Sequence, residues 1–323
     1  MDVSRSRGHS AQARVVVMNG IVCAIPTLGR PQLAARVVHD LLEQTLTPDV
    51  VIVVDASDSE TFAALDVLLG SEDRSRVVHE RAHTASLTAQ RNQGIDLALA
   101  LDFHWDYIQF MDDDVSFDAD YLERAVTTMR DGGWAGLCGA TDEARSTTDA
   151  SIFERVFLLA PPAPGQISKS GRNAGFRFDP TVDRPIAAQW ILGCSLYTRS
   201  VVERQRFWEQ PGYVLYEDVE FSARVNRAGL RVGWLPSLRL GHLELSRSDV
   251  AHERAAYQAV YNRAKVLNSL GRRPGVGFWW GLLGLVARSA GGILLRRRSS
   301  RLRTKGYLRA IRDSRRDFGT VTS

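Results

Sequence analysis

The chain has 323 residues, 44% of them apolar, and a net charge of +4. These values are ordinary for a globular protein and exclude a disordered, collagen-like or disulfide-stapled chain. The charge is unevenly spread, because residues 296–317 carry ten basic and two acidic side chains, a net +8, which leaves −4 for the rest. An acidic bulk argues against a general nucleic-acid-binding protein. Three scattered cysteines form neither a disulfide framework nor a zinc site, and they predict a reducing compartment.

The first half of the chain alternates strand-like and helix-like stretches after residues 1–14, which we expect to be a flexible N-terminus without a secretory signal. Short apolar runs predict strands at 15–25, 50–57 and 107–115, and helical spacing of apolar residues predicts helices at 31–44, 60–69 and 86–101. This order predicts an α/β fold with a parallel sheet and helical crossovers. Ligands of such sheets bind beyond the carboxyl ends of the strands.

The second half is less regular. Residues 144–185 are rich in proline and glycine and predict a long irregular insertion, and long loops in a compact domain are often functional. Strands and helices resume at 187–203, at 215–230 and at 232–244. We place the main boundary near residue 245, so that residues 15–245 form one domain and residues 246–323 form a helical tail.

Three adjacent carboxylates, Asp112, Asp113 and Asp114, follow the apolar strand that begins at residue 107. Neighbouring carboxylates repel one another unless a cation lies among them, and Mg²⁺ and Mn²⁺ prefer oxygen ligands and bridge readily to phosphates. In an extended segment Asp112 and Asp114 point to the same side and Asp113 to the other. The triplet therefore indicates a metal site; the alternative is a solvated acidic turn that caps the next helix through Asp118.

Two further candidates lie late in the domain. Glu217 and Asp218 begin a predicted helix, where carboxylates either complement the helix dipole or provide a general base for a substrate hydroxyl. His242 follows the last predicted strand. A single histidine is usually structural, and this one becomes a metal ligand only if it lies with the aspartates.

The turns after the first two strands are candidates for nucleotide binding. The first contains Pro26, Thr27 and Arg30, and the second contains Asp55 and Asp58. No Walker motif or GxGxxG follows the first strand, which disfavours a P-loop or dinucleotide-binding fold. A carboxylate after the second strand can accept the N3–H of uracil or thymine; the alternative is an ordinary strand-end turn.

Arg91 and Asn92 lie near the start of the helix predicted at 86–101. An arginine at this place can pair with a phosphate or with the acidic triplet. The alternative is an ordinary surface arginine.

In this order the motifs resemble those of the family 2 glycosyltransferases, across residues 20–245. The matching segments are IPTLGRP, VVDASDS, LTAQRNQGI, FMDDDV, ILGCSLYTRSVV and YEDVEFSARVNRAG with Pro236 and His242. The resemblance implies the GT-A fold, a Rossmann-like mixed sheet flanked by helices. Rhamnosyltransferases are among the soluble members with a similar tail.

The resemblance also implies roles for the candidate residues. The expected nucleotide-sugar-binding residues are Pro26, Thr27, Arg30, Asp55, Asp58, Arg91, Asn92, Asp112 and Asp113. The expected ligands of Mg²⁺ or Mn²⁺ are Asp112, Asp114 and His242. Asp218 would be the catalytic base, with Glu217 beside it. One base supports a single in-line displacement, so the sugar transfer would invert the anomeric configuration.

The tail combines an apolar run with the basic cluster. Residues 276–287 are apolar or glycine, too few for a bilayer span, and Phe278, Trp279 and Trp280 suit a membrane interface. Beside a polybasic segment, this run predicts an interfacial helix on an anionic membrane surface. The alternatives are packing against the domain or a second subunit, and a spanning or re-entrant segment.

Together these observations predict a metal-dependent transferase that moves one sugar from a UDP- or dTDP-sugar to a cell-envelope glycan, glycolipid or polyprenyl-linked acceptor. We find no Gln-x-x-Arg-Trp element after the base, which favours single addition over polymerisation. The expected location is cytoplasmic and peripheral at the inner face of the plasma membrane. The alternatives are a non-catalytic nucleotide-sugar- or glycan-binding module and a sugar-1-phosphate nucleotidyltransferase. The sequence leaves the sugar, the linkage and the oligomeric state open.

Overall fold

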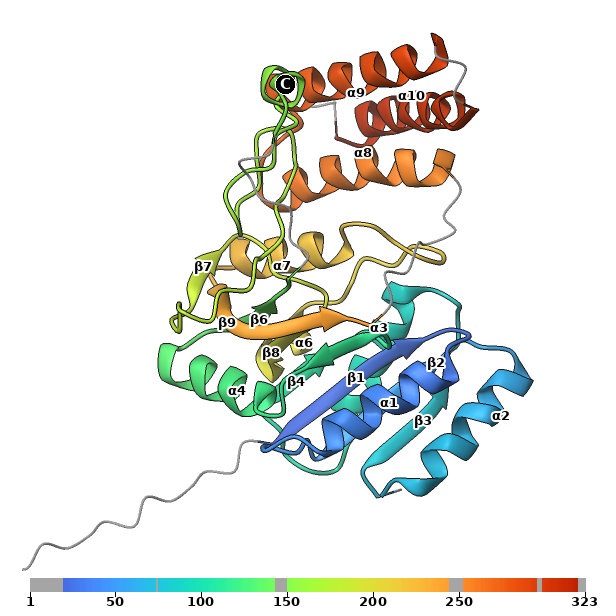
Figure 1. Cartoon of the computed structure of the whole chain (residues 1–323), viewed down its shortest axis with the longest axis vertical. Coiled ribbons are helices and arrows are strands. Elements are labelled where there is room, and N and C mark those ends of the chain that lie inside the picture. The colour runs from blue at the N-terminus through green and yellow to red at the C-terminus, as the bar shows by residue number, and fades with distance from the viewer. Residues whose placement is uncertain (1–19, 74, 143–149, 244–251, 295–297, 319–323) are drawn as a thin grey trace, which may run out of the picture.

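The computed structural model describes residues 20–73, 75–142, 150–243, 252–294 and 298–318. The flexible N-terminus expected at residues 1–14 lies outside this part of the chain, as do the first residues of the strand expected at 15–25. The described strands form one mixed sheet, and three long helices stack above it (Figure 1). This α/β architecture with a helical tail is the fold that the motifs imply.

One half of the sheet is parallel, in the order β3-β2-β1-β4. Its strands are β1 (Ile21–Thr27), β2 (Val50–Asp55), β3 (Val77–Arg81) and β4 (Tyr107–Phe110). The connections are α1 (Pro31–Leu42), α2 (Ser59–Leu68) with a short 3₁₀ turn (Leu69–Ser71), and α3 (Leu87–Leu99). Every residue of β1 and β2 is buried, which explains their unbroken apolar runs.

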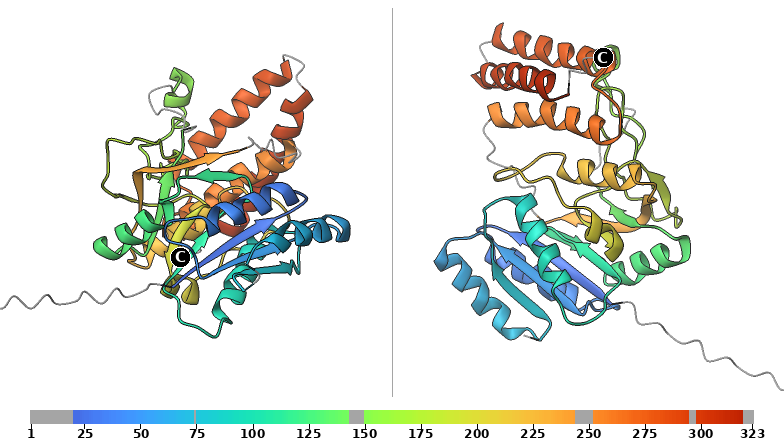
Figure 2. Two further views of the ribbon diagram at one scale, coloured as in Figure 1. Left: turned by 60° about the horizontal axis from the view of Figure 1, so that its bottom comes forward. Right: turned by 180° about the vertical axis from the view of Figure 1, so that it is seen from behind.

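Helices cover both faces of this half. Alternate residues of β1 pack with α1 on one face, while the others pack with α3 on the opposite face. The back view in Figure 2 shows α3 behind the strands that α1 covers in Figure 1. Because the strands are covered on both sides, polar side chains gather at their ends.

The other half of the sheet is mixed and continues the order β4-β8-β6-β9-β5, with β7 also paired to β9. The strands are β5 (Val115–Phe117), β6 (Gly136–Ala140), β7 (Ile186–Ala188), β8 (Ser195–Thr198) and β9 (Val232–His242). The helices are α4 (Tyr121–Gly132), α5 (Ile152–Val156), α6 (Arg199–Arg204) and α7 (Glu217–Arg227). The irregular insertion contains α5 and climbs beside the sheet toward the tail (Figure 1).

The tail consists of α8 (His252–Ser269), α9 (Val276–Leu294) and α10 (Arg298–Phe318). Helix α8 packs against α7, and α10 packs against α8 and α9. Within the described residues, none of the helices combines the length and the apolar character needed to cross a membrane. The tail therefore rests directly on the helix that begins with Glu217 and Asp218.

Candidate active site

The site residues follow the carboxyl ends of adjacent parallel strands. Thr27 ends β1 and is paired with Asp55, which ends β2, while Asp112 comes shortly after β4. Pro26 is buried within β1. The parallel pairing thus brings three segments, far apart in sequence, to one edge of the sheet.

Asp55 is fully buried and holds the loop after β2. Its carboxylate accepts a hydrogen bond of 2.8 Å from the Ser57 amide and lies 3.3 Å from Nε2 of His79. Burial raises the pKa of Asp55, but the hydrogen bonds from His79 and Ser57 outweigh it and leave that pKa lowered. Asp58 is exposed and caps α2, accepting a hydrogen bond of 2.8 Å from the Thr61 amide. Asp55 is therefore engaged inside the protein, whereas Asp58 faces outward.

The acidic triplet splits in a way that the sequence did not indicate. Arg30 donates to Asp113 at 3.0 Å and to Asp114 at 2.8 Å, so these two carboxylates converge on one guanidinium. Thr27 also donates to Asp113 at 2.7 Å. The expectation that Asp112 and Asp114 share one side was wrong, because residues 113 and 114 form a turn between β4 and β5 rather than an extended strand. Burial raises the pKa of Asp113 to about 6.

Asp112 pairs instead with Arg91. The Arg91 guanidinium is fully buried and donates to Asp112 and to Glu217, both at 2.9 Å. Of the two pairings that the sequence allows for Arg91, the structure shows the one with the acidic triplet. Burial opposes the charge of Arg91, but its two carboxylate partners outweigh that effect and raise its pKa. Arg91 thereby joins the turn after β4 to the start of α7.

Glu217 and Asp218 form the first turn of α7, after Tyr216 in a left-handed conformation at φ 68°. Burial, together with the neighbouring charge of Glu217, raises the pKa of Asp218 to about 8. Burial also raises the pKa of Glu217, against the opposing charge of Arg91. A carboxyl that borders a cavity and has a pKa near neutral is suited to proton transfer at physiological pH.

Asp112, Asp218 and His242 line one cavity of about 250 Å³, together with residues 192–194 and 213–217. His242 lies at the end of β9, paired with Val115 of β5. The structure thus brings the residue predicted as a base and two of the predicted metal ligands to one cleft.

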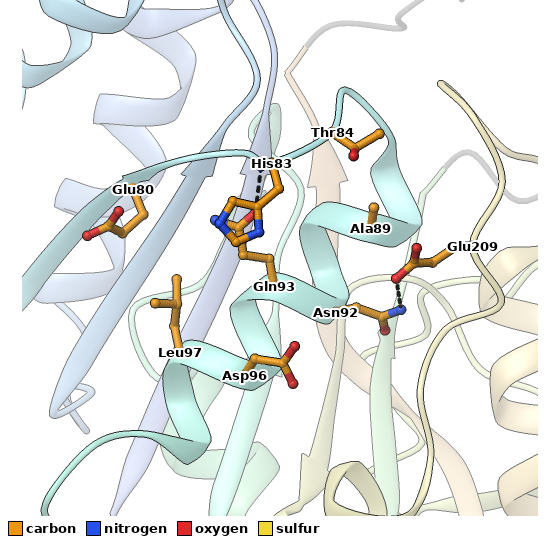
Figure 3. A pocket seen from close by; sticks show the side chains of 9 residues that line it. All are labelled: Glu80, His83, Thr84, Ala89, Asn92, Gln93, Asp96, Leu97 and Glu209. Carbon is orange, nitrogen blue, oxygen red and sulfur yellow. Dashed lines mark hydrogen bonds between the residues drawn. The ribbon is translucent and has the colours of Figure 1, made fainter.

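Asn92 lies elsewhere. It is buried, bonds to the backbone of Phe207 and donates to Glu209 at 2.8 Å. The side chains of Asn92 and Glu209 line a separate cavity of about 380 Å³ beside α3 (Figure 3). Of the predicted nucleotide-binding residues, Asn92 is the one that the structure places in this second cavity.

No group of three or more His, Cys, Asp or Glu side chains stands ready to hold a metal ion in the described part of the chain. The donor types nevertheless fit Mg²⁺ or Mn²⁺, since Asp112 is about one-third exposed and borders the same cleft as His242. Asp114 is engaged by Arg30, and the charge of His242 acts on it. The oxygen atoms of the predicted ligands suit a hard cation. In the structure, however, Asp112 is paired with Arg91 and Asp114 with Arg30.

Sequence reasoning missed the residues of α8 that hold the loop before α7. Gln258 donates to the carbonyl of Tyr213 at 3.1 Å, and Asn262 donates to that of Leu215 at 2.6 Å. Arg254 also bonds to the carbonyl of Pro211. A helix with charges of both signs gives no signal for such contacts, because they depend on how the tail folds back.

The glycosyl transferase family 2 model matches residues 22–182, about half of the chain. A comparison with curated proteins finds no match. The protein therefore belongs to glycosyl transferase family 2 and is a glycosyltransferase. The matched region contains the strand ends, the acidic triplet and Arg91, whereas Asp218 and His242 lie beyond it.

Proposed function

We propose that this glycosyltransferase is an inverting, divalent-metal-dependent enzyme that transfers one sugar from a UDP- or dTDP-sugar to a hydroxyl of a cell-envelope glycan or glycolipid. The observation that carries this proposal is Asp218, a half-buried carboxyl of raised pKa in the wall of the same cleft as Asp112 and His242. A base in such a cleft fits abstraction of a proton from an attacking hydroxyl. A single base supports one displacement and therefore inversion.

The donor nucleotide is assigned to the ends of β1 and β2. Asp55 is already bonded to Ser57 and His79. Its proposed role is to fix the loop after β2, against which the nucleobase of the donor lies. Asp58 remains exposed at the edge of that loop. Arg30, Thr27 and Asp113 form the adjoining polar wall, where the guanidinium suits a phosphate.

The proposed metal ligands are Asp112, Asp114 and His242. A bound Mg²⁺ or Mn²⁺ would neutralise the negative charge of the diphosphate leaving group. Arg30 is bonded to Asp114 in the described structure and must release it for that carboxylate to serve as a ligand. Arg30 then becomes available to a phosphate oxygen of the donor.

The acceptor approaches from the side of Asp218. The carboxylate of Asp218 accepts the hydroxyl proton, and the hydroxyl oxygen attacks the anomeric carbon. The bond from that carbon to the diphosphate oxygen breaks at the same time, and the nucleoside diphosphate leaves with the electron pair. Arg91 holds Glu217 and Asp112 on one guanidinium, which keeps the acceptor side and the diphosphate side of the cleft in fixed relation. Without a Gln-x-x-Arg-Trp element, we propose single rather than processive addition.

We also propose that the tail binds the inner surface of an anionic membrane. Five exposed apolar residues recur on one face of α9: Val276, Trp280, Leu283, Ala287 and Leu294. Trp280 stacks on Phe157 and donates to the Val156 carbonyl at 2.7 Å, so the exposed apolar residues of α5 adjoin this face. The neighbouring helix α10 exposes Arg301, Lys305, Arg309, Arg312, Arg315 and Arg316. Apolar and basic residues side by side fit a surface of anionic lipid.

Calorimetric titration with UDP and dTDP, with and without Mn²⁺, tests the donor site. We expect binding that requires Mn²⁺ and is lost in Asp114→Ala, while Asp118→Ala, an exposed aspartate four residues away, binds as the wild type does. The tighter nucleotide identifies the donor class. Binding of neither nucleotide under any condition would refute the donor and metal assignments.

Sedimentation with phosphatidylglycerol vesicles tests the membrane surface. We expect the full chain to sediment and the Trp280→Glu/Leu283→Glu variant to stay in the supernatant. Val67→Glu, which alters a highly exposed apolar residue of α2, is the matched control. Equal sedimentation of all three proteins would refute α9 as the contact surface.

A further inference from the structure

Arg263 of α8 is a buried cation without a counter-ion. Its residue is only 4% exposed, and its single hydrogen bond is from Nε to the carbonyl of Ala259 one turn earlier. In the described part of the chain, neither terminal nitrogen of this guanidinium meets a carboxylate or another acceptor. Neither of these two nitrogens is fully buried, so water reaches them and an anion can reach them as well.

A second arginine lies in the segment that packs on Arg263. Gly171 turns the insertion against α8 at φ 75°, and a Cβ built on Gly171 would lie 3.0 Å from the Cβ of Arg263. Arg172 is the next residue, half-buried, and its side chain has no ion pair with any described carboxylate. Burial lowers the pKa of Arg263, and the positive charge of Arg172 also lowers it. The two cations are therefore held near each other despite their repulsion.

This pair lies behind the acceptor side of the cleft. The residue before Arg263, Asn262, donates to the carbonyl of Leu215, which directly precedes Tyr216. Tyr216 in turn borders the cleft and directly precedes Glu217 and Asp218. Gly171 belongs to the insertion and Arg263 to the first helix of the tail, so the pair lies where the insertion meets the tail.

We propose that Arg172 and Arg263 bind a phosphoryl group of the acceptor. Two guanidinium groups with free donors match the oxygens of a phosphate or diphosphate, which accept several charge-assisted hydrogen bonds. The position fits an acceptor whose sugar hydroxyl reaches Asp218 while its phosphoryl group stays between the insertion and α8. A lipid-linked sugar diphosphate has this chemistry, and its lipid would extend toward the apolar face of α9.

This inference rests on the proposed transfer to a lipid-linked acceptor, but it can be tested apart from it. The probe is farnesyl diphosphate, a short lipid diphosphate without a sugar, titrated into the full chain in detergent with EDTA to keep metal out of the cleft. We expect wild type to bind, and Arg263→Met and Arg172→Gln each to weaken binding about tenfold to a hundredfold, as loss of a charged hydrogen bond predicts. Arg263→Lys, which keeps the charge, should recover part of the affinity.

Two controls separate this site from others. Arg177→Gln removes an exposed arginine of the same insertion and should bind as wild type does. Arg30→Gln removes the cation of the polar wall assigned to the donor nucleotide. It should also leave the binding of farnesyl diphosphate unchanged. If farnesyl diphosphate fails to bind wild type, or if only Arg30→Gln weakens it, the proposal is wrong.

The source of the phosphoryl group is tested with two further probes. Inorganic diphosphate should bind more weakly than farnesyl diphosphate but with the same dependence on Arg263. Phosphatidylglycerol vesicles should sediment Arg263→Met as well as wild type; if this variant loses the vesicles instead, the site binds lipid headgroups and the acceptor assignment fails. If the protein binds farnesyl diphosphate through Arg263 but binds neither UDP nor dTDP, the phosphoryl site proposed here stands and the proposed donor site is refuted.

Thermal unfolding gives a readout that a merely structural arginine would not match. Replacing an unpaired buried cation by methionine, of similar length, should leave the melting temperature unchanged or raise it. Farnesyl diphosphate should raise the melting temperature of wild type and not that of Arg263→Met. A large fall for Arg263→Met without ligand, with wild-type affinity in Arg172→Gln, would assign both residues to the fold alone.

Discussion

The floor of the cleft and the junction between the insertion and α8 each contain a buried arginine, and the two are treated differently. Arg91 meets two carboxylates at 2.9 Å, one from the turn after β4 and one from α7. Arg263 meets no carboxylate among the residues that the structure describes, and its neighbour Arg172 has the same sign. In the first region the arginine is paired with carboxylates of the protein. The second region has an excess of positive charge, which suits an anionic ligand.

This difference separates two roles that belong to one reaction. Paired charges hold the reacting groups at fixed positions before the substrate arrives, and preorganised groups of this kind lower the barrier to reaction. Unpaired cations gain their partner only when an anion binds. We therefore expect substitutions in the cleft to act mainly on kcat, and those of Arg172 and Arg263 mainly on the KM for the acceptor.

The largest expected effect is that of Asp218→Asn. The amide keeps the size of the carboxyl but cannot accept the hydroxyl proton, so kcat should fall about 10²- to 10⁴-fold. Transfer of sugar from donor to acceptor is the measurement, with nucleotide binding by calorimetry as the control that the cleft is intact. Near-normal turnover with tight nucleotide binding would assign the base to another residue.

The next effect concerns stability. Arg91→Met leaves Asp112 and Glu217 without their counter-ion, and breaking a buried pair in this way costs about 3–5 kcal/mol of the free energy of unfolding. Urea unfolding at pH 7 measures this loss. Arg263→Met is the matched variant, and it should lose little or no stability because no ion pair is broken. Equal losses for both variants would remove the distinction between the two regions.

How far these residues follow from the sequence differs between the regions. The parallel half of the sheet and the grouping of Thr27 and Asp55 follow from apolar runs that end in polar residues, since adjacent parallel strands end at one edge. For Arg91 the sequence allowed two partners, a phosphate or the acidic triplet, and did not decide between them. The turn that sends Asp113 and Asp114 to one guanidinium depends on Arg30, which lies more than eighty residues earlier.

The contacts at the junction between the insertion and α8 could not be predicted from the sequence. Asn262 and Arg263 belong to a helix whose sequence shows charges of both signs, and this pattern does not predict which of its residues are buried. Their burial depends on the packing of α8 against α7 and on Gly171 in an insertion without periodic pattern. These are long-range contacts between segments whose local sequence does not predict a partner.

The pH dependence of activity follows from the raised pKa of Asp218. The base is active when deprotonated, so kcat/KM should rise about tenfold per pH unit from pH 6 and level off above about pH 8. The folded state keeps this proton through a range in which the unfolded chain has lost it, so the free energy of unfolding should fall between about pH 4 and pH 8. Asp218→Asn should remove this contribution. Half-maximal activity near pH 4 would contradict the shift.

The smallest effect tests whether the tail acts on the cleft at all. Asn262→Ala removes the hydrogen bond of 2.6 Å to the half-buried Leu215 carbonyl, and a net loss of about 1 kcal/mol is expected for a bond of this kind. Because that carbonyl belongs to the loop before Asp218, part of the cost should appear as a severalfold fall in kcat, with nucleotide affinity unchanged. Asn268→Ala, an exposed asparagine at the end of the same helix, should change neither. If Asn262→Ala loses stability but keeps its kcat, α8 supports the fold without positioning the base, and the two regions are coupled only through the acceptor.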